Sequence, residues 1–237
     1  ALPISDNDDI LRLYFYASNK EYLKEVISLI PAHNGSIICD VIGRDEKIGE
    51  LVQALNNVGF EIYAKFQRML CNEINVVDNT EETGVEFASP NDVDEILDIT
   101  YSEFDPLTAR IPSKSVLLNK INNKEVFIVR KDDRVAGFTS FDSNNKKVAL
   151  LDHVIVRPEY RNQNIARRIL YYKWAKYNQS KFYILWINEL CKGPIKYHEC
   201  NGFIKDGIYD YVLTIREEGD RKSTRLNSSH HGISYSV

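Results

Sequence analysis

The stretch of residues 154–166 (VIVRPEYRNQNIA) has the residue types and order of an anion-binding turn. An apolar strand ends at Val156, Pro158 turns the chain, and a helix begins near Ile165. In a connection of this kind, several backbone N–H groups converge at the end of the helix where its dipole is positive. The sequence therefore indicates a site for a phosphate group, or alternatively an ordinary connection between a strand and a helix.

This stretch resembles the acetyl-CoA pyrophosphate loop of the GNAT N-acetyltransferase superfamily, in which Arg/Gln-x-x-Gly-x-Gly/Ala follows a Val-x-Pro-x-Tyr turn. Asn164 replaces the first Gly of that pattern, and Asn162 stands where many members carry another Gly. Because Asn is the non-Gly residue that best tolerates a positive φ, we expect the loop to keep its shape. The resemblance implies acetyl-CoA as cofactor, held by Arg161, Asn162, Gln163, Asn164, Ile165 and Ala166.

The activity that the resemblance implies, acetyl transfer to an amine, requires the amine to lose a proton. An alkyl ammonium of pKa ~10.4 is neutral only about four times in ten thousand at pH 7, so a base must accept its proton. Asp152 lies on the strand before the loop, where GNAT enzymes commonly carry a carboxylate that accepts this proton through water. An Asp in an apolar strand is equally consistent with a structural hydrogen bond near the strand end.

The main chain of the same strand is implied to contact the cofactor. In this fold the strand before the loop splays from the next one, and its free N–H and C=O groups pair with pantetheine and polarise the thioester. The resemblance assigns this role to the backbone of Val154, Ile155 and Val156. Their side chains are expected in the core.

A second family motif, Leu-x-Val-x-x-x-Asn-x-x-Ala followed by a Tyr shortly before Gly-Phe, is matched less well. Cys191 stands for the Asn that contacts the cofactor, and His198 stands for the Tyr that donates a proton to the CoA thiolate. A His of pKa ~6.5 is about one-quarter protonated at pH 7 and would be a competent donor. A one-residue shift of the helix would present Tyr197 instead, and an exposed, non-catalytic His198 is the remaining alternative.

The elements expected from Gly84 onward follow the GNAT order β-α-α-β-β-β-α-β-α-β-β. Helical spacing predicts a helix after Ser89 and a short one over 116–121, while Asp132-Asp133 and Asn144-Asn145 mark turns between strands. The closing elements are a helix near 195–200 and a pair of strands around Gly207. The predicted fold class is α/β (α+β), a GNAT fold with a mixed central sheet flanked by helices.

We predict four segments along the chain. Residues 1–71 form a smaller α/β half-domain, and the acidic stretch 72–83 is a linker. Residues 84–219 form the GNAT domain, and 220–237 resemble a translated sequencing adapter and are predicted to be non-native. Because residues 57–70 weakly repeat 200–213, the half-domain is interpreted as degenerate and GNAT-like, with chance similarity as the alternative.

Composition restricts the function classes. With 43% hydrophobic and 27% charged residues, the sequence is that of a globular protein without a membrane span. Its four Cys form no CxxC pair or metal cluster, which predicts reduced thiols, a cytoplasmic location and no metal. The net charge of −4 and the absence of a basic stripe argue against nucleic-acid binding.

The expected partner is an amine, either a small molecule or a peptide, with no nucleic acid and no membrane; an oligomer is possible. Glu103, Phe104 and Asp105 lie in the segment that shapes the amine side of GNAT clefts, which favours a cationic acceptor or else marks a solvated acidic turn. Two other functions remain open: a catalytically weak acyl-CoA-binding module, and a fold used only for protein association.

Overall fold

The structure, a computed structural model, describes residues 2–7, 10–15, 22–28, 35–72, 84–142, 148–176 and 182–215. The described chain divides into two compact units. Of the described residues, those up to 67 together with 207–215 form the first, and those within 68–206 form the second. This division differs from the predicted one because the last strand of the chain starts in the second unit and continues in the first. The predicted linker beyond residue 72 and the predicted non-native tail lie outside the described residues.

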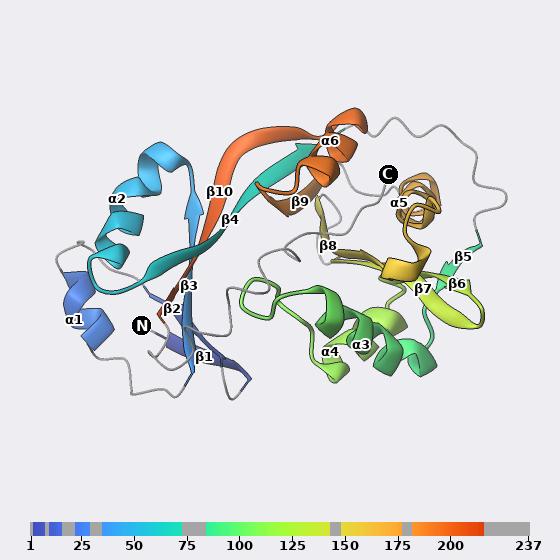
Figure 1. Cartoon of the computed structure of the whole chain (residues 1–237), viewed down its shortest axis with the longest axis horizontal. Helices are drawn as coiled ribbons and strands as arrows, with labels where there is room; N and C mark the ends of the chain where they lie inside the picture. Colours follow the sequence, from blue (N-terminus) through green and yellow to red (C-terminus); the bar gives the residue numbers. More distant parts are fainter. Residues whose placement is uncertain are drawn as a thin grey trace. The chain divides into compact units, whose positions relative to one another are not determined.

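The second unit has a mixed sheet, as predicted (Figure 1). Its strands are β5 (Val85–Phe87), β6 (Val126–Lys131), β7 (Arg134–Asp142), β8 (Val148–Val156) and β9 (Phe182–Asn188). Neighbours from β5 to β8 pair antiparallel, whereas β8 and β9 pair parallel. The parallel pair requires a crossover, which the helix after β8 provides.

Helices cover both faces of this sheet. Its helices are α3 (Val93–Glu103), α4 (Lys114–Asn122), α5 (Ile165–Lys176) and α6 (Lys192–Cys200). Successive side chains on a strand point to opposite faces, so an apolar strand has two faces to bury. On one face, Phe127, Val129, Ala136, Val154 and Val156 pack against α5. On the other, Val126, Ile128, Val135, Phe138 and Ile155 pack against α3 and α4. Figure 1 shows α5 on one side of these strands and α3 and α4 on the other.

Local sequence signals place several boundaries of this unit. Asp132 and Asp133 both have positive φ, 52° and 57°, as the type I′ turn of a two-residue hairpin requires. Ser89 and Asp92 form a capping box before α3. The turn predicted at 144–145 lies outside the described residues. The predicted pair of strands around Gly207 is wrong: β10 runs unbroken from Ile204 to Ile215, with Gly207 at φ +77°.

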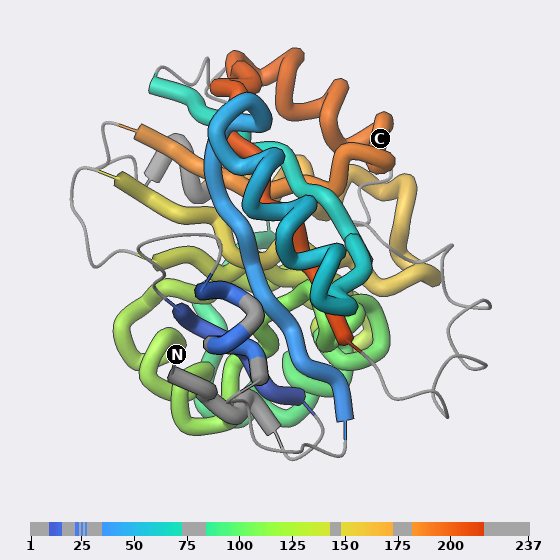
Figure 2. Tube along the Cα trace, turned by 90° about the vertical axis from the view of Figure 1, so that its left-hand side faces the viewer, coloured from blue at the N-terminus to red at the C-terminus, as the bar shows by residue number. Residues whose placement is uncertain are grey.

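The first unit is a smaller α/β arrangement. It comprises β1 (Leu2–Asn7), β2 (Ile10–Tyr14), α1 (Leu23–Ser28), β3 (Ser36–Gly43), α2 (Asp45–Asn56) and most of β4 (Glu61–Cys71) and β10. β2 pairs parallel with β3, and β3 pairs antiparallel with β10. Helix α2 runs beside β3 (Figure 2) and buries Ile48, Val52 and Leu55. Strand β1 was not predicted, and the interpretation of this unit as a degenerate GNAT half stays a prediction.

None of the helices in the described segments is both long enough and apolar enough to cross a bilayer.

Candidate functional site

Strands β8 and β9 are paired over only part of their length. Their parallel register runs from Val148 opposite Phe182 to Leu151 opposite Leu185, although β8 continues to Val156 and β9 to Asn188. On its other edge, β8 stays paired with β7 as far as Val156. Within these two described strands, the backbone of β8 from Asp152 to Val156 therefore pairs with no residue of β9.

The hydrogen-bond pattern shows which backbone groups face that side. The Arg157 N–H donates to the Ala136 carbonyl at 2.9 Å, so Arg157 and Ala136 are a hydrogen-bonded pair of the antiparallel ladder. Such pairs alternate, which directs Ile155 toward β7 and both Val154 and Val156 toward β9. The backbone of Ile155, predicted to contact the cofactor, is therefore used within the sheet. The Val154 and Val156 groups remain candidates.

Asp152 occupies a β-bulge. Ser140 lies opposite His153 and Phe141 opposite Leu151, so Asp152 is an extra residue on β8. Bulges redirect side chains and are over-represented beside active sites. The Asp152 carboxylate accepts a 2.6 Å ion-pair contact from Lys120 Nζ of α4, and both side chains are 19% exposed. This ion pair favours the structural alternative for Asp152, and its role as a base stays a prediction.

The loop after β8 has the backbone shape expected of it. Asn162 and Asn164 have φ of 61° and 58°, the left-handed region that Gly usually occupies. The Asn164 carbonyl accepts the Arg168 N–H at 2.9 Å, which makes Asn164 the N-cap of the 12-residue helix α5. The amides of Ile165, Ala166 and Arg167 then have no acceptor within their own helix. They form an N-terminus suited to an anion.

Arg161 is committed to protein contacts. Its Nε donates to the Val156 carbonyl at 3.2 Å, and its guanidinium forms an ion pair with Glu103 at the end of α3. The side chain therefore ties the loop both to the end of β8 and to α3. Glu103, expected on the amine side, has its carboxylate in the same ion pair.

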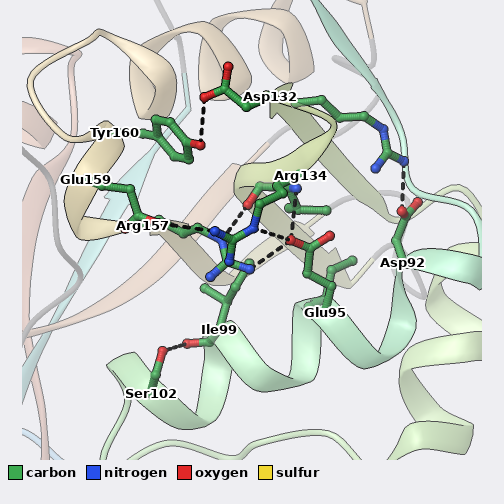
Figure 3. Close-up of polar contacts among 12 residues, drawn as sticks. Asp92, Glu95, Ile99, Ser102, Asp132, Arg134, Arg157, Glu159 and Tyr160 are labelled. Atoms are coloured by element: carbon green, nitrogen blue, oxygen red, sulfur yellow. Dashed lines mark hydrogen bonds and ion pairs between the residues drawn. The ribbon is translucent and has the colours of Figure 1, made fainter.

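A polar network supports the turn before the loop (Figure 3). Arg157 donates to Glu95 of α3 and to the Val135 carbonyl, each at 2.8 Å. The Tyr160 hydroxyl donates to Asp132 at 3.0 Å. These contacts fix residues 157–160 against α3 and the β6–β7 turn. Sequence reasoning missed Arg157 and Glu95, because residues 62 positions apart give no local signal of contact.

His198 differs from its predicted environment. Its side chain is fully buried, with Tyr197 and Phe203 ring centroids at 5.4 Å and 5.0 Å. Burial lowers the His198 pKa to about 3, so the imidazole is neutral at pH 7. The expected one-quarter protonation is wrong, and so is the alternative of an exposed residue. Burial raises the pKa of the half-buried Tyr197 phenol, which keeps its proton at neutral pH.

Cys191 is the residue directly before α6, and its role as a cofactor contact in place of an Asn stays a prediction. Its thiol is half-buried against the α5-side core, and burial raises the thiol pKa. Asn188, three residues earlier, shapes this connection: its side chain accepts the Leu190 N–H and its carbonyl accepts the Cys191 N–H, both at 2.9 Å. Asn188 was missed because it was not at the expected motif spacing.

His153 is a second polar residue that the sequence analysis did not single out. Its Nδ1 lies 3.3 Å from the Ser140 hydroxyl, and its ring meets the edge of Phe104 at a centroid distance of 5.0 Å. Burial lowers the His153 pKa to about 4, which keeps the ring neutral beside Asp152 and Lys120. No group of His, Cys, Asp or Glu in the described part of the chain could hold a metal ion.

Comparisons with known proteins agree with this geometry. The sequence profile of the acetyltransferase (GNAT) family matches residues 92–199, which span α3 to α6 and include the bulge and the loop. Residues 92–199 form a GNAT acetyltransferase domain. None of the curated protein sequences matches the chain.

Solved structures resemble the chain at the level of the fold. A GNAT-family acetyltransferase from Colwellia psychrerythraea has a TM-score of 0.54 and 16% identity, covering 88% of this chain and 77% of that one. A GCN5-related N-acetyltransferase from Kribbella flavida has a TM-score of 0.58 and 12% identity, covering 83% and 74%. A functionally unknown conserved protein from Staphylococcus epidermidis has a TM-score of 0.59 and 14% identity, covering 87% and 84%.

Proposed function

We propose that the GNAT domain transfers an acetyl group from acetyl-CoA to a primary amine by direct transfer within a ternary complex. The observation that carries the proposal is the parting of β8 from β9 immediately before a loop with left-handed Asn162 and Asn164. The parted edge offers backbone donors and acceptors to an extended amide chain such as pantetheine. The start of α5 offers amides to a diphosphate.

The proposed roles follow from the positions of the groups. The amides of Gln163, Asn164, Ile165 and Ala166 receive the diphosphate, and the backbone groups of Val154 together with the Val156 N–H receive the pantetheine arm. Arg161 orients the loop through its contacts with Val156 and Glu103 rather than by binding phosphate. The cofactor supplies the activated acetyl group.

The proton-transfer roles belong to Asp152 and Tyr197. Asp152 accepts the amine proton once an acceptor ammonium replaces Lys120 as its ionic partner. Tyr197 is a better candidate than His198 for protonating the leaving thiolate, because the phenol keeps its proton at pH 7 whereas the His198 imidazole is neutral and lacks the imidazolium proton. Changing Tyr197 to Phe should then lower turnover more than cofactor affinity.

Calorimetric titration with CoA of two loop variants and one control variant tests cofactor binding. We expect Asn164→Gly to bind like the wild type and Asn164→Ala to bind about 5- to 30-fold more weakly, because a left-handed Ala costs about 1–2 kcal/mol. Asn123→Ala is the matched control, since Asn123 ends α4 with φ −79° and should leave binding unchanged. Absence of CoA binding by the wild type at millimolar concentration would refute the proposal.

A catalytically weak acyl-CoA-binding module is the second candidate. The Lys120–Asp152 ion pair and the burial of His198 favour it, because both reduce the groups ready to move protons. A thiol-release assay over a panel of primary amines distinguishes the two. With an enzyme, the rate of CoA release rises with the concentration of the acceptor amine, whereas with a binding module it does not. The expected cytoplasmic location belongs to either function and is part of the proposal.

A further inference from the structure

The Lys120–Asp152 pair places an amine of the protein beside the proposed base. Nζ lies 2.6 Å from Asp152 Oδ2 and 3.3 Å from the Phe141 carbonyl. Direct transfer requires the acceptor nitrogen to lie within hydrogen-bond reach of the base, and Lys120 Nζ already satisfies that condition. The side chain therefore stands where the proposed mechanism needs a substrate ammonium.

The position of Nζ is fixed from both ends. Helix α4 is anchored by Leu117 and Ile121, which are 1% and 2% exposed, and the Phe141 carbonyl holds the ammonium from the strand side. Asp152 is on a bulge, directly before the edge of β8 that parts from β9. An amine held in this way loses little freedom on reaching its reactive position, so its effective concentration is high.

We propose that Lys120 occupies the acceptor-amine position of the domain and, when no amine substrate is bound, is itself acetylated on Nζ. This inference rests on the proposed function. The ammonium loses two protons, the first to Asp152. The neutral nitrogen forms a bond to the thioester carbonyl carbon as the carbon–sulfur bond breaks. The departing thiolate takes up one proton and the other is released to solvent, leaving N-acetyl-lysine and CoA.

Lys114 provides a matched control on the same helix. It also forms a 2.6 Å ion pair, with Asp94, but its side chain is 59% exposed against 19% for Lys120. Spontaneous acetylation by acetyl-CoA in solution favours the more accessible amine and would modify Lys114 first. Acetylation within the site would modify Lys120 first. The order of modification therefore separates the two routes.

The test is peptide mass spectrometry of the full chain incubated with isotopically labelled acetyl-CoA. We expect Lys120 to be labelled at least about tenfold faster than Lys114, because proximity raises its effective concentration. Asp152→Asn should abolish the difference, and Lys120→Arg should remove the label while keeping the positive charge. Labelling of Lys120 no faster than Lys114 would overturn the proposal.

A second measurement needs no acetyl donor bound to the domain. Trace acetic anhydride modifies accessible amines, and saturating CoA should slow modification of Lys120 without affecting Lys114 if Nζ faces the cofactor. Equal modification with and without CoA would overturn the proposal. A protein that binds CoA and acetylates added amines, yet leaves Lys120 unlabelled, contradicts this inference alone. A protein that binds no CoA contradicts the proposed function as well.

Discussion

His198 and His153 are both buried, and burial keeps both rings neutral at pH 7. The motif spacing identified position 198 as the one nearest the thiolate in GNAT enzymes, and α6 does contain it. The sequence could not show that Phe203 and Tyr197 enclose the ring, because burial depends on how α6 packs. Lys120 was missed for a similar reason: 32 residues separate it from Asp152, and neither residue type predicts the contact.

The two buried His residues should make the folded state sensitive to acid. Burial lowers the His198 pKa from 6.5 to about 3, so between these values the unfolded chain binds a proton that the folded chain does not. Stability is therefore present above pH 6.5 and is lost as the pH falls toward 3. Lowering the pH from 7 to 5 should cost about 2 kcal/mol through His198 alone.

Urea unfolding at pH 7 and pH 5 measures this effect. The variant His198→Gln should lose about 2 kcal/mol less than the wild type over the same interval, although it is less stable at both pH values. His153→Gln should behave in the same way, because burial lowers the His153 pKa to about 4. Equal losses in the wild type and both variants would show that these rings titrate normally.

At the scale of elements, residue types predicted turns better than they predicted irregular pairing. Asn162 and Asn164 have a left-handed backbone, and residues 132–133 form a type I′ turn. Residue type predicts both features, because Asn and Asp adopt a positive φ more readily than other residues with a side chain. Asp152 is a polar residue in an otherwise largely apolar strand, but residue type alone did not predict that it forms a bulge. The extent of pairing between β8 and β9 was expected only from the family resemblance.

Gly137 controls how closely β7, β8 and α5 approach one another at the site. A Cβ atom there would lie 2.8 Å from the Ile155 carbonyl oxygen and 3.0 Å from Ile165 Cγ2. Gly137→Ala should therefore displace β8 and the start of α5, lower the free energy of unfolding by about 1–3 kcal/mol and weaken CoA binding. Denaturant unfolding and calorimetric titration measure the two effects.

Gly49 in α2 is the control for this substitution. A Cβ atom at Gly49 meets nothing within 4 Å, and Ala is the better helix former by about 1 kcal/mol. Gly49→Ala should leave the stability unchanged or raised, and CoA binding unchanged. If Gly137→Ala and Gly49→Ala have the same effect on the free energy of unfolding and on CoA binding, close packing at Gly137 does not position the site.

At the scale of the molecule, helix and strand patterns located elements but did not assign them to units. Strands β4 and β10 each contribute residues to both compact units, whereas the predicted linker at 72–83 stays a prediction. Polar composition marks a loop, whereas membership of a core depends on contacts between distant strands. The similarity of residues 57–70 to 200–213 coincides with these two strands, and its interpretation as a repeat stays a prediction.

We expect the predicted domain 84–219 not to fold stably without the end of β4, which precedes it in the chain. Met69 and Cys71, which are 0% and 2% exposed, belong to the core beneath α5 together with Phe127 and Val154. A fragment of residues 84–219 lacks both side chains, and loss of one buried Met side chain costs about 2–5 kcal/mol. We expect this fragment to show no cooperative unfolding, whereas the full chain does.

The substitution Met69→Ala isolates the packing contribution within the full chain. It should lower the free energy of unfolding by about 2–5 kcal/mol, because the site is enclosed and cannot refill with water. Ile62→Ala on the same strand is the control: Ile62 is 48% exposed, and its loss should change stability by about 0.5 kcal/mol or less. A fragment 84–219 that unfolds cooperatively, with a stability near that of the full chain, would establish that the core of the GNAT domain is complete without β4 and that the boundary lies in the acidic stretch.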